Sequence, residues 1–142
     1  MLLNVQWQKN MQLVDANVII RYLLNDSPQL SEKARSIISN GRAYAKPEII
    51  AEVVYVLQKV YRIEKGIIRK FIYALFHDIS CTEYECVLSA IDIYASVSLD
   101  FVDCLLIAYH QINQETIFSF DKKLNKHLDM TIYPEPGNND LI

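Results

Sequence analysis

LVDANVIIRYLLND, residues 13–26, places Asp15 between two apolar runs. The apolar residues before Asp15 predict the end of a short strand, and those of residues 17–24 recur at the spacing of a helix. A strand that leads directly into a helix is typical of a parallel α/β sheet, because parallel strands need crossover connections. The carboxylate at this junction either caps the helix or lies at the carboxyl edge of the sheet, where such folds bind ligands.

The rest of the chain repeats this alternation of strand and helix. Ser27 and Pro28 suit the start of a second helix, and Asn40 with Gly41 suits its end. Apolar residues at helical spacing predict further helices within residues 47–61, 62–78, 82–96, 100–112 and 121–128. Short strands are predicted at residues 12–14, 42–45, 78–81, 115–120 and 131–134, of which 115–120 is the clearest. We therefore predict one α/β domain over residues 1–142, with a parallel sheet and more helix than strand.

The composition is that of an ordinary globular protein, with 51% hydrophobic and 22% charged residues and a net charge of −3. No apolar stretch approaches the roughly 20 residues that span a bilayer, so we expect no membrane association and a cytoplasmic location. Three cysteines without CxxC spacing and three scattered histidines predict neither a disulfide framework nor a zinc site. Residues 1–10 are predicted to be an N-terminal extension, with Met11 as the native start, and residues 134–142 a loose tail.

Acidic residues recur at the predicted junctions. Asp15 and Asp121 directly follow predicted strands, and Asp100 and Asp103 share the first turn of one helix. Glu52 lies among apolar residues of the helix that begins near Pro47. Each acid taken singly suits a helix cap or a favourable place in a helix dipole. Capping does not explain why junctions at different strands all carry carboxylates, and neither Asp103 nor Glu52 is at a cap position.

Carboxylates that converge at one sheet edge repel one another unless a cation joins them. Oxygen ligands with room for water suit Mg²⁺ or Mn²⁺. These cations activate water and neutralise phosphate oxygens during phosphodiester cleavage. The acids therefore indicate a metal-dependent hydrolase.

Four stretches, each built around one acid, resemble the motifs of PIN-domain ribonucleases, in particular the VapC-like toxins of bacterial toxin–antitoxin pairs. They are, in chain order, LVDANVIIRYLLND, PEIIAEVVYVL, LDFVDCLLIAY and IFSFDKKL. The resemblance runs from about residue 12 to residue 133. It implies a three-layer α/β/α fold with a central parallel sheet of about five short strands. It also implies a homodimer, and an antitoxin that covers the site with a basic side chain.

Carried over position by position, the resemblance assigns the metal site to Asp15, Glu52, Asp103 and Asp121. Asp100 is implied as a fifth acid. The resemblance also gives supporting roles to Asn17 beside Asp15 and to Ser119 beside Asp121. Ser119 stands where threonine is usual in the family, and it keeps the hydroxyl group.

The leading hypothesis is a Mg²⁺- or Mn²⁺-dependent endoribonuclease that acts on an RNA of unresolved class, whether tRNA, rRNA or mRNA. Its basic residues either form a solvated helix face or grip the RNA backbone. The candidates for RNA contact are Arg21, Lys59, Arg62, Arg69 and Lys70. Two alternatives stay open: a catalytically silent PIN-like module that binds RNA or protein, and a receiver-type phosphoacceptor domain. The receiver type is disfavoured because it needs a lysine at a strand end, whereas Lys122 follows an aspartate.

Overall fold

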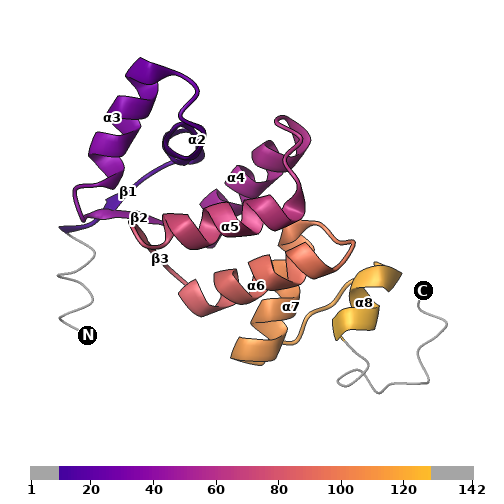
Figure 1. Cartoon of the computed structure of the whole chain (residues 1–142). Helices are drawn as coiled ribbons and strands as arrows, with labels where there is room; N and C mark the ends of the chain where they lie inside the picture. Colours follow the sequence, from indigo (N-terminus) through magenta and orange to yellow (C-terminus); the bar gives the residue numbers. More distant parts are fainter. Residues whose placement is uncertain (1–9, 129–142) are drawn as a thin grey trace, which may run out of the picture.

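The computed structural model of the chain describes residues 10–128. The predicted extension up to residue 9, the loose tail and the strand at residues 131–134 lie outside these residues. None of the helices in the described range is long and apolar enough to cross a membrane. In Figure 1 the strands lie at one end of the molecule, and the last helices extend away from them toward the other end.

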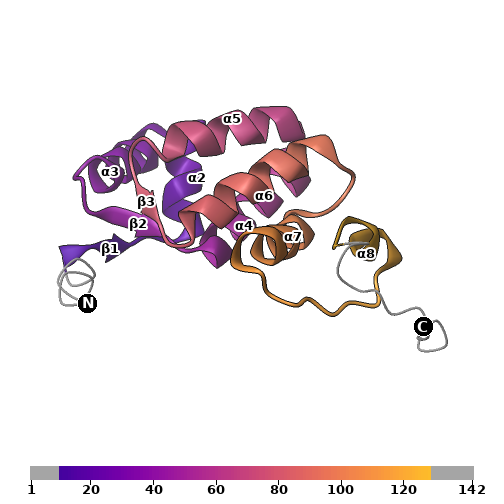
Figure 2. The ribbon, with the colours of Figure 1, turned by 90° about the horizontal axis from the view of Figure 1, so that it is seen from below.

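The sheet contains three short parallel strands, β1 (Gln12–Leu13), β2 (Ala43–Ala45) and β3 (Ser80–Cys81), in the order β1-β2-β3. Figure 2 shows the three strands side by side. Beyond β1, the Val14 N–H donates to the Tyr44 carbonyl over 3.0 Å, which extends the pairing to the residue before Asp15. Asp15 therefore stands at the carboxyl end of the first strand, as the sequence predicts.

Seven helices fill the described part of the chain around these strands. Two of them begin with proline, whose fixed φ suits the first helical position. The chain reverses after the second helix at Gly41, where φ is +81°. The bounds are α2 (Ala16–Leu24), α3 (Pro28–Ile38), α4 (Pro47–Lys59), α5 (Lys65–Leu75), α6 (Tyr84–Ser96), α7 (Phe101–Asn113) and α8 (Lys122–Leu128).

Tyr94 of α6 joins three helices in the core. Its side chain is fully buried and lies edge-on to Phe101 of α7, with ring centroids 5.9 Å apart. Its hydroxyl donates to Gln58 Oε1 of α4 over 2.6 Å, so that the buried oxygen is satisfied. The core thus fixes the start of α7 against α4, and this is the region that carries the acidic residues.

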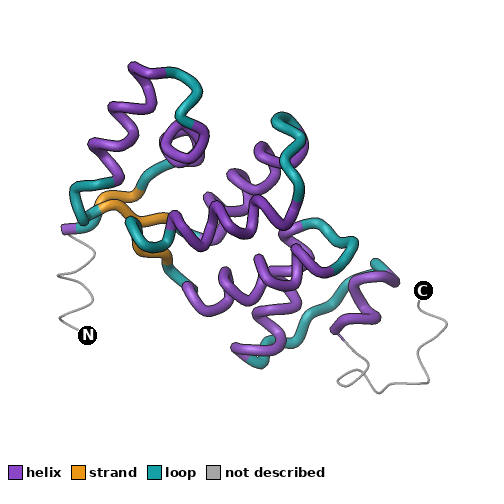
Figure 3. Tube along the Cα trace, in the orientation of Figure 1, coloured by secondary structure: helices purple, strands orange, loops and turns teal. Residues whose placement is uncertain are grey.

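The α/β class, the parallel strands and the excess of helix are confirmed, but one predicted strand is wrong. Residues 115–120, the clearest strand signal in the sequence, form a loop between α7 and α8 (Figures 2 and 3). Phe118 and Phe120 of this loop are 86% and 84% exposed. Among the described residues β1 pairs only with β2, so the sheet has three strands there instead of about five. Residues 115–120 are not part of the sheet β1-β2-β3.

Candidate functional site

Asp15 and Glu52 lie together at one cavity of about 320 Å³. Asp15 caps α2, because its Oδ1 accepts the Val18 N–H over 3.1 Å. Glu52 is exposed on α4 and reaches the same cavity, which is also lined by Arg21 and Tyr61. The capping interpretation of Asp15 is therefore correct, and it leaves the second carboxylate oxygen without a hydrogen bond within residues 10–128.

Asn17, the predicted support for Asp15, lines this cavity as well, and its side chain is exposed. Arg21 also faces the cavity but is paired with Asp26, whose Oδ1 lies 3.1 Å from the guanidinium Nη1. The cavity therefore has a basic side chain at its edge, partly neutralised by an acid outside it.

Asp100, Asp103 and Asp121 line a second cavity, of about 410 Å³, together with Lys65 and Lys123. Asp100 occupies the N-cap position of α7 but its side chain makes no capping hydrogen bond. Asp103 lies within the first turn of the same helix and is half-buried. Three of the acids named from the sequence therefore line one cavity.

The electrostatics of the second cavity centre on Asp103. Burial, the negative charge of Asp121 and that of Asp100, in decreasing order, raise the pKa of the Asp103 carboxyl. This carboxylate accepts no hydrogen bond from the described part of the chain, so no hydrogen bond from that part offsets its desolvation. An acid held in this way gains from a cation placed beside it.

Asp121 is held by the turn that begins α8. Its Oδ1 accepts the backbone N–H groups of Lys123 and Leu124 over 2.9 and 3.1 Å. The Ser119 hydroxyl accepts the Asp121 N–H over 2.9 Å, and the Asn125 amide donates to the Ser119 carbonyl over 2.8 Å. Ser119 therefore fixes the backbone of Asp121 directly.

Asp15 and Glu52 line one cavity, and Asp103 and Asp121 line another. Within residues 10–128 no set of three or more Asp, Glu, His or Cys side chains lies close enough to hold a metal ion. Asp121 follows the loop at residues 115–120 and stands at the start of α8, where it lines the cavity of Asp103. Helix α4 lines both cavities, with Glu52 at the first and Lys59 at the second.

The donor set still has the chemistry that a hard divalent cation requires. All the acids offer carboxylate oxygens, the ligands that Mg²⁺ and Mn²⁺ prefer. The cysteines are free and buried, and burial raises the pKa of the Cys104 thiol to about 12, so it offers no thiolate. The mutual repulsion of Asp103, Asp121 and Asp100 is the feature that a cation would relieve.

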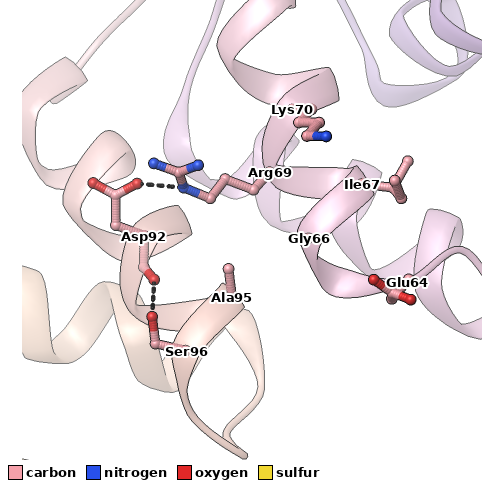
Figure 4. Close-up of a pocket in the computed structure, with 8 residues that line it drawn as sticks. All are labelled: Glu64, Gly66, Ile67, Arg69, Lys70, Asp92, Ala95 and Ser96. Carbon is pink, nitrogen blue, oxygen red and sulfur yellow. Dashed lines mark hydrogen bonds and ion pairs between the residues drawn. The ribbon is translucent and has the colours of Figure 1, made fainter.

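The predicted RNA-contacting residues are dispersed. Arg69 and Lys70 line a hollow of about 420 Å³ between α5 and α6 (Figure 4). Arg69 pairs there with Asp92, its Nε lying 2.8 Å from Oδ1. Arg62 lies between α4 and α5 at a φ of 56°, and only Lys59 of these four reaches the second acidic cavity.

Sequence reasoning missed three residues at the two acidic cavities. Tyr61 lines the first cavity and Lys123 lines the second, and no sequence pattern marks either residue. Lys65 was visible only as a member of the basic run at residues 59–70, and its contacts could not be predicted from that run.

The helix-rich parallel fold and the acids at the ends of its elements define a nuclease-type α/β domain. The chain belongs to the PIN domain family, which matches residues 13–127. PIN domains are generally nucleases, and they usually use divalent metals. No curated protein and no solved structure matches the chain significantly.

Proposed function

We propose that the protein is a Mg²⁺- or Mn²⁺-dependent endoribonuclease. The observation that carries this proposal is the half-buried Asp103, which faces Asp121 and Asp100 and accepts no hydrogen bond from residues 10–128. A carboxylate in a cavity whose pKa is raised by burial and by two neighbouring acids is a candidate for a functional group. Membership of the PIN family supports the reaction type.

Asp103 and Asp121 would hold the cation, with Asp100 as a further acid at the same cavity. Asp15 and Glu52, which line the other cavity, are proposed as ligands on the family resemblance alone. When bound, such a cation activates water and neutralises charge on the phosphate. Lys59 and Lys123, which line the second cavity, would contact the phosphates that flank the cleaved bond. Phosphate contacts of this kind make RNA binding weaken as salt rises.

The biological setting is part of the same proposal. We assign the protein to a toxin–antitoxin pair as its toxin, acting in the cytoplasm as a homodimer. The support is the resemblance of the four acidic stretches to VapC-like toxins. The cognate antitoxin would cover the acidic cavities with a basic side chain, and co-purification of the toxin with a co-expressed antitoxin checks this.

The direct test measures cleavage of a labelled single-stranded RNA in Mg²⁺, in Mn²⁺ and in EDTA. Asp103→Asn and Asp121→Asn should lose activity by at least about 100-fold while staying folded, because each removes a charge needed by the cation. Glu32→Gln, which alters an exposed acid on α3, is the matched control and should cleave like the wild type. Full activity in Asp103→Asn, or cleavage that persists in EDTA, contradicts the proposal.

A second candidate is a silent PIN-like module that binds RNA or protein without cutting. The separation of Asp15 and Glu52 from the other acids favours it, because the described residues hold no set of three metal ligands. Tight RNA binding without cleavage at any Mg²⁺ or Mn²⁺ concentration would establish this role. The receiver-type alternative would instead show a mass increase after incubation with a small phosphodonor.

A further inference from the structure

Lys65, the first residue of α5, places its ammonium group among three segments of the chain. Its Nζ donates to the Val97 carbonyl over 3.0 Å and to the Leu99 carbonyl over 2.9 Å. The same atom lies 4.3 Å from the centroid of the Tyr94 ring, within the range of a cation–π interaction. The start of α5 is thereby joined to the end of α6 and to the loop that leads into α7.

These contacts show that Lys65 is not a group that grips RNA. A lysine ammonium has three N–H donors and no acceptor. Two donors are used by the carbonyls of Val97 and Leu99, and the remaining side of the group faces the Tyr94 ring. Lys65 therefore differs from Lys59 and Lys123, which line the same cavity and are exposed.

The loop that Lys65 holds decides where the acids stand. Residues 97–100 connect α6 to α7, and Leu99 immediately precedes Asp100. The first turn of α7 then follows, in which the Cys104 N–H donates to the Asp100 carbonyl over 3.2 Å. Because Asp103 lies within this turn, a shift of the loop would move Asp103 relative to Asp121.

We propose that Lys65 is a positioning residue, which ties the loop before α7 and so holds Asp103 in place to share a divalent cation with Asp121. This inference rests on the proposed function, since it assumes that the acids bind a cation. The two possible roles of Lys65 predict opposite effects on cation binding. If Lys65 holds the loop before α7, it strengthens cation binding. If it is only a positive charge near the acids, it weakens cation binding. The sign of the change on mutation therefore separates the two roles.

The test uses the full chain and Mn²⁺ as the probe, with free Mn²⁺ counted by electron paramagnetic resonance. Lys65→Met should raise the Mn²⁺ dissociation constant by roughly 10-fold or more, the usual effect of removing a partner that orients metal ligands. Lys65→Arg, which keeps the charge and several donors, should recover part of the affinity. Lys33→Met, at an exposed lysine of α3, is the matched control and should bind like the wild type.

Hydrogen exchange gives a second readout that does not depend on any metal. The Cys104 amide, which reports on the first turn of α7, should exchange faster in Lys65→Met than in the wild type or in Lys33→Met. Circular dichroism shows whether each variant is folded. If Lys65→Met fails to fold, Lys65→Gln replaces it. Glutamine is polar, but it is one atom shorter than lysine and uncharged, so it cannot keep both contacts to the Val97 and Leu99 carbonyls and the same changes are expected of it.

The outcomes separate the inference from the proposed function. Unchanged or tighter Mn²⁺ binding in Lys65→Met, with the wild type binding normally, overturns the positioning role and leaves the nuclease proposal standing. Unchanged exchange at Cys104 overturns it as well. A wild-type chain that binds no Mn²⁺ and cuts no RNA in its presence refutes the proposed function, and the role of Lys65 toward the cation falls with it.

Discussion

Replacing Asp103 by asparagine should make the metal-free protein more stable at neutral pH while it abolishes activity. The pKa of Asp103 is raised by burial, by Asp121 and by Asp100. The folded protein therefore holds the ionised form less readily than the unfolded chain does, and ionisation costs stability. Asparagine has nearly the same shape and no charge, so that it removes this cost.

The expected gain at pH 7 is about 1 kcal/mol, the usual size of a stability change at a partly buried side chain. Solvent screening around a half-buried side chain keeps the gain from being larger. For a chain of 142 residues, 1 kcal/mol raises the melting temperature by about 3 °C. A gain of this size is common when a residue kept for function is replaced.

The pH dependence follows from the direction of the shift. Below the pKa of an aspartate in an unfolded chain, about 3.9, Asp103 is protonated in both states and costs nothing. As pH rises through the raised pKa of the folded state, the wild type loses stability and the variant does not. The advantage of Asp103→Asn should thus be full at pH 7 and absent at about pH 3.

Thermal unfolding in EDTA at the two pH values measures this difference. Asp15→Asn is the matched control, because asparagine caps a helix about as well as aspartate and Asp15 faces the other cavity. Its stability should stay within about 0.5 kcal/mol of the wild type. The reasoning is refuted if Asp103→Asn destabilises the protein, or if its gain is as large at acid pH as at pH 7.

Three further outcomes are expected. Saturating Mg²⁺ or Mn²⁺, at about 100 times the dissociation constant, should stabilise the wild type by about 2.7 kcal/mol in thermal unfolding, and EDTA should reverse the effect. Asp121→Ala should cost about 1 kcal/mol in urea unfolding through the lost cap of α8, whereas Asp121→Asn should keep most of it, so equal losses would contradict the capping role. Leu57→Ala, at a fully buried side chain, should cost about 2–5 kcal/mol in the same assay. Ile67→Ala, at a side chain 39% exposed, should cost clearly less than this.

Most of the fold follows from signals that act over a few residues. Proline at the start of α3 and α4, Gly41 after α3 and apolar residues at helical spacing place the helices. Asp15 caps its helix through its own neighbour Val18, a contact within one turn. Local signals of this kind can be read from one sequence because both partners stand close together in it.

The strand predicted at residues 115–120 shows where local signals stop. Its alternating β-branched and aromatic residues favour an extended backbone, and the segment is not helical in the structure. Extended backbone becomes a strand only when a neighbour supplies hydrogen bonds, and that neighbour, β1, lies about a hundred residues earlier in the chain. Nothing in the segment itself records whether that pairing forms.

The same distinction governs the acidic site. The sequence shows that Asp103 and Asp100 share a helical turn, and these two acids do lie at one cavity. It cannot show which junctions meet, and in the structure Asp121 lines the cavity of this pair while Asp15 lines another with Glu52 of α4. The position of residues 115–120 therefore bears on chemistry as well as on fold. A strand beside β1 would deliver Asp121 toward Asp15, whereas the loop observed at residues 115–120 leads Asp121 to the cavity that Asp103 lines.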